Sequence, residues 1–153
     1  MREVVMVGSG DPVVIPEFLD RFLGFEDGVL TGIFIVLPRG DSEGRQIELQ
    51  IQALDRTSPG QDGPHGRLFG WKLVRIRMRG VSEYSLSETM KYPLQVLSDG
   101  LRVGLLDDQF LLDLEPGPDD WSPAAFRDAS IRGPRQYVIA KHFSYEVSDG
   151  PFI

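Results

Sequence analysis

The sequence contains no cysteine and only two histidines, His65 and His142. The absence of cysteine excludes disulfides, thiolate zinc sites and cysteine nucleophiles. The two histidines form no pair at helical spacing and no cluster with aspartate at ligand spacing. The sequence therefore predicts neither a metal centre nor a bound cofactor.

Long apolar runs are also missing. The longest, VLTGIFIVLP at 29–38, is about half of the ~20 residues that a membrane-spanning helix needs. Only four apolar residues follow Glu3 before Gly8, which is too few for the core of a signal peptide. We therefore expect no membrane partner, and a cytoplasmic location is the default.

The residues that are present are typical of a globular protein. The chain has 153 residues, of which 41% are hydrophobic and 25% charged, and this predicts one globular domain spanning 1–153. Seventeen glycines and eleven prolines indicate many turns and favour a β-rich fold. The formal net charge of −7 argues against generic nucleic-acid binding.

Hydrophobic periodicity predicts several strands. Residues 30–37 are apolar on both faces apart from Thr31, which is the pattern of a central strand. Residues 46–54 alternate between apolar and polar, as a strand with one buried face does. Further strands are expected at 3–7, where the pattern is that of a short buried strand, at 67–79 with a continuation over 81–87, and at 135–147.

Turn residues predict how these strands are connected. Asp99-Gly100, between two apolar runs in 95–103, indicates a hairpin with a type I′ turn and positive φ at both residues. Residues 105–114 predict a second hairpin. The segment 55–66 contains no apolar residue and is expected to be the longest loop.

Two helices are expected. Pro16 suits a first helical position and Gly24 suits a C-terminal cap, so a helix is predicted over 15–24. Ser122 and Pro123 suit the start of a short helix within 122–130. The sequence as a whole predicts a β-rich α+β fold: a curved, mainly antiparallel meander sheet with one N-terminal helix and one short late helix.

Three arginines alternate with apolar residues in LVRIRMRG at 73–80. In a strand, Val74, Ile76 and Met78 face the core, so Arg75, Arg77 and Arg79 face outward. A hairpin joining 46–54 to 67–79 would set Glu48 and the neighbouring glutamines opposite the arginines. We expect a solvated sheet face that Glu48 partly neutralises. The alternative is a recognition surface for an acidic partner or ligand.

Other candidate binding residues lie near this strand and in the acidic stretch after the first hairpin. Trp71 could stack on a ligand beside the arginines, and Asp107 and Asp108 could belong to an acidic patch for a basic protein partner. The acids do not follow the spacing of a calcium loop. Asp107, Asp113 or Glu115 could still meet His142 in a catalytic cleft, and this enzyme hypothesis ranks third.

In its general composition and order of predicted elements, the chain resembles small bacterial proteins of the toxin-immunity type, which are compact, acidic, cysteine-free α+β proteins. The resemblance covers the order of helix and strands and the region from LSDGLRV to DDQFLLDL. It implies a non-enzymatic module that binds a protein partner. The alternative is a small-molecule or anion-binding domain with a pocket between sheet and helix. Nucleic acid is not expected as a partner, and an oligomer is compatible with the sequence.

Overall fold

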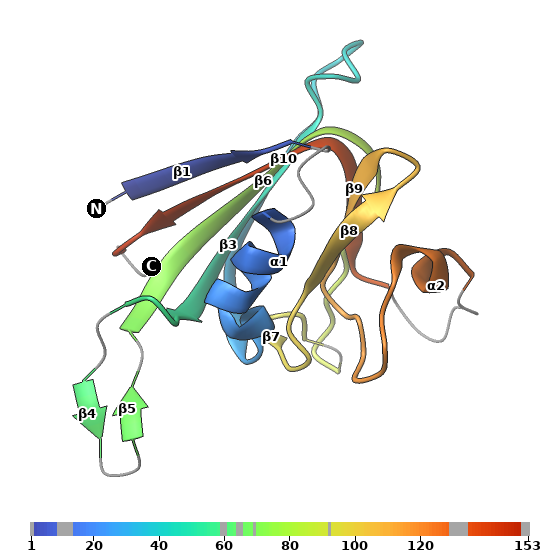
Figure 1. Cartoon of the computed structure of the whole chain (residues 1–153). Helices are drawn as coiled ribbons and strands as arrows, with labels where there is room; N and C mark the ends of the chain where they lie inside the picture. Colours follow the sequence, from blue (N-terminus) through green and yellow to red (C-terminus); the bar gives the residue numbers. More distant parts are fainter. Residues whose placement is uncertain are drawn as a thin grey trace.

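The computed structural model describes residues 2–8, 14–58, 61–63, 66–68, 70–91, 93–128 and 135–150. Its main feature is an eight-stranded antiparallel sheet that curls around a short helix (Figure 1). The elements in chain order are β1 (Arg2–Val7), α1 (Val14–Arg21), the 3-10 helix η1 (Leu23–Phe25), β2 (Gly28–Val36), β3 (Gln46–Asp55), β4 (Gln61–Gly63), β5 (Gly66–Leu68), β6 (Gly70–Ser85), β7 (Val96–Leu97), β8 (Arg102–Leu106), β9 (Gln109–Asp113), α2 (Pro123–Asp128) and β10 (Tyr137–Ser148).

The strand order explains the curl. The sheet runs β7-β2-β3-β6-β10-β9-β8, and β1 also pairs with β10. Two strands therefore share one edge of β10: β9 pairs with Tyr137–Ala140 and β1 with Phe143–Ser148. The register with β6 shifts between Ile139 and Ala140, close to the point where β10 changes partner. Such a bulge increases local twist and lets β8 and β9 fold over toward α1.

The core lies between the concave face of the sheet and the helical segment 14–25. Phe18, Phe22 and Phe25 are each at most 1% exposed and point from this segment into the sheet. The Phe18 ring stacks on Tyr145 of β10 at 4.1 Å between ring centroids. Figure 1 shows α1 inside the curl, between β3 and β8. The spacing of the three phenylalanines gives the segment one apolar face, and burying that face holds it in the sheet.

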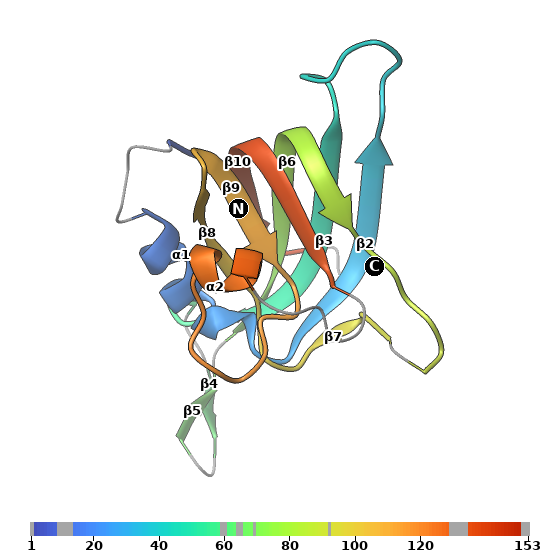
Figure 2. The same ribbon diagram turned by 90° about the vertical axis from the view of Figure 1, so that its right-hand side faces the viewer.

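The second helix covers part of the convex face (Figure 2). Phe126 of α2 packs with Leu111 of β9 and Ile139 of β10, in a cluster separate from the main core. Ser122 caps this helix by accepting a hydrogen bond from the backbone N–H of Ala125 at 3.0 Å. Its neighbours Val138 and Ala140 lie in the main core, so strand alternation turns Ile139 to the convex face, where α2 covers it.

The expected fold class is confirmed, a β-rich α+β fold with an antiparallel sheet, an early helix and a short late helix. The alternation over 46–54 is that of β3, whose burial pattern is strictly periodic. The strand expected over 135–147 is β10, and the strand over 67–79 with its continuation over 81–87 is mainly β6. Both predicted helices are present, the first as α1 followed by η1.

The hairpin predicted at 95–103 is wrong. Its two arms join opposite edges of the sheet, because β7 pairs with β2 and β8 pairs with β9. Gly100 has φ +71, but Asp99 is not among the residues with positive φ. The type I′ geometry lies instead in the second predicted hairpin, where Asp107 and Asp108 have φ of 50 and 63 between β8 and β9.

The central position predicted for 30–37 is wrong as well. β2 pairs with β3 on one side, but on the other side β7 pairs only with Gly28 and Val29. The rest of β2 has no partner strand among the described residues. The short buried strand expected at 3–7 is also an edge strand. Its Val4 and Met6 are exposed and only Val7 is buried.

The segment 55–66 is not a plain loop. β3 continues to Asp55, and β4 and β5 form a short antiparallel ribbon that extends away from the sheet (Figure 1). His65 lies outside the described residues. Neither helix has the length and apolar run to cross a bilayer, within the part of the chain that the structure describes.

Candidate binding surfaces

The arginine strip lies on the convex face, in the predicted register. β3 pairs with β6 so that Gln46, Glu48 and Gln50 stand opposite Arg79, Arg77 and Arg75. Arg77 donates to Glu48 at 3.1 Å. The alternation with buried Val74, Ile76 and Met78 places the three arginines outside the core.

Glu146 of β10, on the other side of β6, is a second counter-charge. Register sets Glu146 opposite Arg75, and Arg75 Nη1 donates to its carboxylate at 3.2 Å. Glu146 also pairs with Arg2 of β1 at 3.0 Å, and Arg75 Nε lies 3.8 Å from Glu48. The carboxylates of Glu48 and Glu146 thus alternate with guanidinium groups across four strands. These groups belong to Arg2, Arg75 and Arg77. Glu48 and Glu146 therefore offset part of the charge of the strip, while Arg79 has no ion-pair partner among the described residues and leaves the strip weakly positive.

The remaining predicted site residues are dispersed. Arg79 and Trp71 are exposed on β6 but eight positions apart, at separate places along one strand. Asp107 and Asp108 form the turn between β8 and β9, where Asp107 lies 3.9 Å from Arg127 of α2. Their positive φ gives them a structural role in the turn.

The acids proposed for an enzyme do not meet His142 as a set. Asp113 stands opposite Tyr137, five residues before His142 on β10, which is ~16 Å along a strand. Asp113 accepts hydrogen bonds from Trp121 Nε1 at 3.0 Å and from the backbone N–H of Glu115 at 2.9 Å. Burial raises the pKa of Asp113, and burial together with the charge of Asp113 raises the pKa of Glu115. Asp113 thus fixes Trp121 and the backbone of Glu115.

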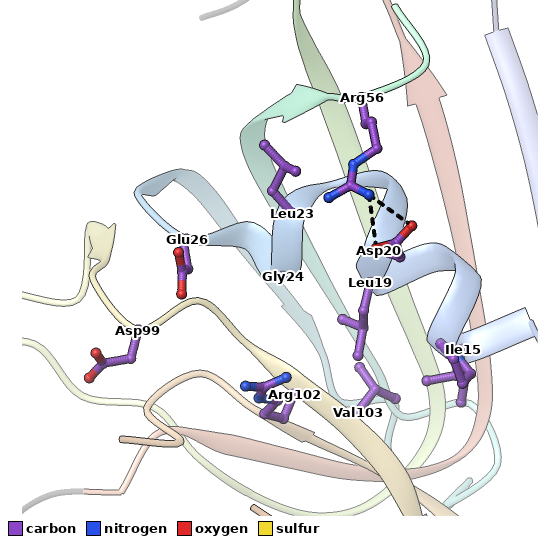
Figure 3. A pocket seen from close by; sticks show the side chains of 11 residues that line it. Ile15, Leu19, Asp20, Leu23, Gly24, Glu26, Arg56, Asp99, Arg102 and Val103 are labelled. Carbon is purple, nitrogen blue, oxygen red and sulfur yellow. Dashed lines mark hydrogen bonds and ion pairs between the residues drawn. The ribbon is translucent and has the colours of Figure 1, made fainter. Parts of the chain in front are cut away.

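A cleft lies between the helical segment and β8, in the position predicted for a pocket between sheet and helix. Its volume is about 630 Å³. Figure 3 shows Ile15, Leu19 and Val103 gathered on one side and Glu26 and Asp99 on the other. The complete lining is Ile15, Pro16, Leu19, Asp20, Leu23, Gly24, Glu26, Arg56, Asp99, Arg102 and Val103.

Charges of both signs surround this cleft. Arg56 pairs with Asp20 at 3.2 Å across its rim (Figure 3). Arg102 has no ion-pair partner among the described residues, and Glu26 and Asp99 are exposed. This combination of an apolar wall with a rim of mixed charge suits a small amphiphilic molecule. Among the residues that the structure describes, no group of three acidic or histidine side chains forms a metal site.

The edge of β2 is the most unusual surface. Ile33, Phe34, Ile35, Val36 and Leu37 are consecutive, and each is between 39% and 52% exposed. Ile33 and Ile35 stand opposite buried Leu49 and Ile47, so they continue the concave core layer. Phe34 and Val36 stand opposite Glu48 and Gln46 on the convex face. Both faces of this strand are therefore apolar and open to solvent.

The opposite side of the sheet is better protected. On β1, Arg2 forms an ion pair with Glu146, and Glu3 forms one with Arg21. On β8, a Cβ at Gly104 would lie 2.7 Å from Pro123, the first residue of α2, and 3.2 Å from Trp121, so the start of α2 and the residues before it pack against this strand. Natural edge strands usually carry charges, proline or a cover of this kind. From Gly28 to Pro38 the sequence has no charged residue, so β2 lacks the commonest protection.

Sequence reasoning noted the apolar stretch of β2 but assigned it to the interior. The available signal was its termination by Pro38 and Arg39 directly after Leu37, which is common at edges. Glu146 was missed because it lies 71 positions from Arg75. Comparisons with protein-family models, with curated proteins and with solved structures find no match to this chain.

Proposed function

We propose that this chain is a non-enzymatic protein-binding module that takes an extended segment of a protein as an additional strand along β2. The observation that carries the proposal is the uncharged edge over 31–37, in which the side chains of residues 33–37 are exposed on both faces. Strand addition derives its affinity from main-chain hydrogen bonds and its specificity from alternate side chains. The edge of β2 offers main-chain hydrogen-bonding groups for affinity and alternating side chains for specificity.

The concave face strengthens this proposal. Ile33 and Ile35 extend a core layer whose next members, Leu49 and Ile47, are fully buried. An added strand with apolar residues at alternate positions would extend that layer by one strand. Removing apolar side chains from water contributes about 25 cal/mol per Å². The arginine strip is a weaker candidate because Arg75 and Arg77 are already paired with Glu146 and Glu48.

A peptide-display selection on the native chain tests the proposal. Selected peptides should lose binding to the Phe34→Lys variant, because a lysine on the edge disfavours strand pairing. They should keep binding to Met6→Lys, which places the same charge at an exposed apolar position of β1. Bound peptide should also slow amide hydrogen exchange within 31–37. Peptides that bind Phe34→Lys as well as the native chain would contradict the proposal.

The partner of such a module would be a toxin if the toxin-immunity resemblance holds, and a cytoplasmic location belongs to the same proposal. Both rest on the sequence alone.

The cleft between α1 and β8 supports a second candidate, a small-molecule-binding domain. Its volume of about 630 Å³ is within the range of ligand sites, and polar groups flank its apolar wall. Leu19→Arg would fill the cleft with a charged side chain. In a fragment screen by ligand-observed NMR, hits that bind the native chain should lose binding to Leu19→Arg and keep binding to Met6→Lys. Hits that bind all three proteins equally would contradict this candidate.

A further inference from the structure

We infer that the segment added along β2 is the same strand of a second copy, so that two chains join edge to edge about a two-fold axis at Phe34. This inference rests on the proposed function, since it names the occupant of the proposed docking edge. It would fuse two eight-stranded sheets into one continuous antiparallel sheet.

The limits of the free edge determine the register. At the start of β2, the neighbouring segment takes the edge as far as Leu30, whose N–H donates to the carbonyl of Gln95 at 2.7 Å. At its end, Pro38 has no N–H to donate. No strand in the described part of the chain pairs with this edge between them, over 31–37, and Phe34 is the central residue of that stretch. Antiparallel pairing of two such stretches along their whole length sets Phe34 opposite Phe34.

This register is self-complementary on both faces. It sets Ile33 opposite Ile35 on the concave side, so each copy supplies the apolar neighbour that the other lacks. On the convex side it sets Gly32 opposite Val36, and the two Phe34 rings meet at the axis. The Phe34 ring already lies over Gly32 of its own chain, where a Cβ would be 3.1 Å from the ring. Isologous contacts of this kind close after two copies.

Charge is compatible with this occupant. The chain carries a formal net charge of −7, so two copies repel each other over most of their surfaces. The stretch from Gly28 to Pro38 contains no charged residue, so the joint brings no like charges face to face. A partner with charged side chains would have to bury them against Ile33 or Ile35, at a cost of several kcal/mol per unpaired charge.

The absence of cysteine allows a direct test with single introduced thiols. Residues directly opposite each other in an antiparallel pair have Cα atoms about 4.5–5.5 Å apart, within the range that a disulfide spans. Phe34→Cys should therefore form a cross-linked dimer under mild oxidation. Ile33→Cys alone should cross-link slowly, because two copies of position 33 would be diagonal neighbours about 7–8 Å apart. A mixture of Ile33→Cys with Ile35→Cys should cross-link as readily as Phe34→Cys.

Sedimentation velocity over a dilution series is the second measurement. The native chain should sediment at twice its mass of 17.1 kDa and dissociate on dilution. Dissociation is expected because the interface between the two copies has fewer residues than a standard protein–protein interface, which has about 20–30 residues on each side. Phe34→Lys should be monomeric with an unchanged circular dichroism spectrum, and Met6→Lys should remain dimeric. If Phe34→Lys does not fold, the three cysteine variants decide the test.

A native chain that is monomeric at every concentration would overturn the inference. So would a dimer that cross-links at Met6→Cys instead of Phe34→Cys. The proposed function fails separately. If selected peptides require Phe34 while the native chain is monomeric, β2 binds another protein and only the self-pairing is wrong. If the chain is monomeric and the peptides ignore Phe34→Lys, both proposals fail.

Discussion

Arg21, the last residue of α1, holds the buried carboxylate of Asp55 through both of its oxygens. Arg21 Nε donates to one oxygen at 3.2 Å and Nη2 to the other at 3.0 Å. Thr57 adds hydrogen bonds from its backbone N–H and its hydroxyl. Arg21 also reaches Glu3 of β1 at 2.9 Å. The cluster therefore fastens the helix to the end of β3 and to the edge strand β1.

Asp55→Asn should destabilise the protein by about 1.5–3 kcal/mol, the value of a hydrogen bond to a charged group. The amide would turn an N–H₂ group toward a donor of Arg21 or Thr57 and remove the charge that Arg21 faces. Asp20→Asn is the control, because Asp20 pairs with Arg56 on the exposed rim and should contribute less than about 1 kcal/mol. Urea unfolding of both variants measures this difference. Equal losses would show that the buried pair has no special role.

The same pair predicts a pH dependence. Burial raises the pKa of Asp55, but the hydrogen bonds from Arg21 and Thr57 and the charge of Arg21 outweigh it and leave the pKa below its ordinary value. The stabilisation is therefore complete above the unfolded pKa of about 3.9 and is lost as pH falls through the lower folded pKa. The difference in unfolding free energy between the native chain and Asp55→Asn should be constant near neutral pH. Below pH ~4 it should shrink. A difference that does not change with pH would contradict this assignment.

Local patterns in the sequence predicted most individual elements correctly. The period of two over 46–54 and around Arg75 and Arg77 reports burial directly, because one face of β3 and β6 packs on the helical segment. Ser122 and Pro123 predicted the start of α2 because capping depends on residues within one turn. Such features are local, and tertiary structure left them unchanged.

Features that depend on distant partners were not predictable. Asp99-Gly100 has the composition of a hairpin turn, but the strands on either side of it pair with other strands. The glycine at position 100 instead allows the backbone to lie close to the backbone of Gly24. The apolar pattern of β2 predicts that both of its faces are buried. It does not indicate whether the same chain or another chain buries them. That ambiguity separates the predicted central strand from the observed edge.

Gly100 should tolerate no side chain. Its φ is +71, and a Cβ there would lie 2.0 Å from the carbonyl oxygen of Gly24, a backbone atom. Gly117 is a matched control with φ +77 and open space around it. Gly117→Ala should cost about 1 kcal/mol from backbone strain alone. Gly100→Ala should cost about 3 kcal/mol or more. Thermal unfolding of both variants separates strain from contact, and equal losses would contradict the close approach.

A glycine in the turn between β8 and β9 should raise the stability of the protein. Asp108 has φ 63, a conformation that glycine adopts without a steric penalty. The left-handed strain that glycine removes is roughly 1–2 kcal/mol and its extra loss of backbone entropy is roughly 0.5–1 kcal/mol, so Asp108→Gly should stabilise the protein by about 0.5–1 kcal/mol. Asp99→Gly should not stabilise it, because Asp99 is outside the set of positive-φ residues. Denaturation midpoints compare the two variants. A gain at Asp99 and a loss at Asp108 would restore the hairpin that the sequence alone suggested.

The arginine strip gives a graded prediction across one strand. Ile76 is fully buried on the concave face, so Ile76→Ala should cost about 2–5 kcal/mol. Arg77 is half exposed and, among the described residues, pairs only with Glu48, so Arg77→Ala should cost no more than about 0.5 kcal/mol.

Arg75 should fall between these two. Its guanidinium group contacts both Glu48 and Glu146, and each of those carboxylates is less than one quarter exposed. Arg75→Ala would remove the guanidinium group between these two partly buried carboxylates and leave Glu48 with Arg77 alone and Glu146 with Arg2 alone among the described residues. Its cost should therefore exceed that of Arg77→Ala, and added salt should reduce the difference by screening the ion pairs. If Arg75→Ala and Arg77→Ala have equal effects at low salt, the network with Glu146 does not contribute to folding, and the arginines are independent surface charges.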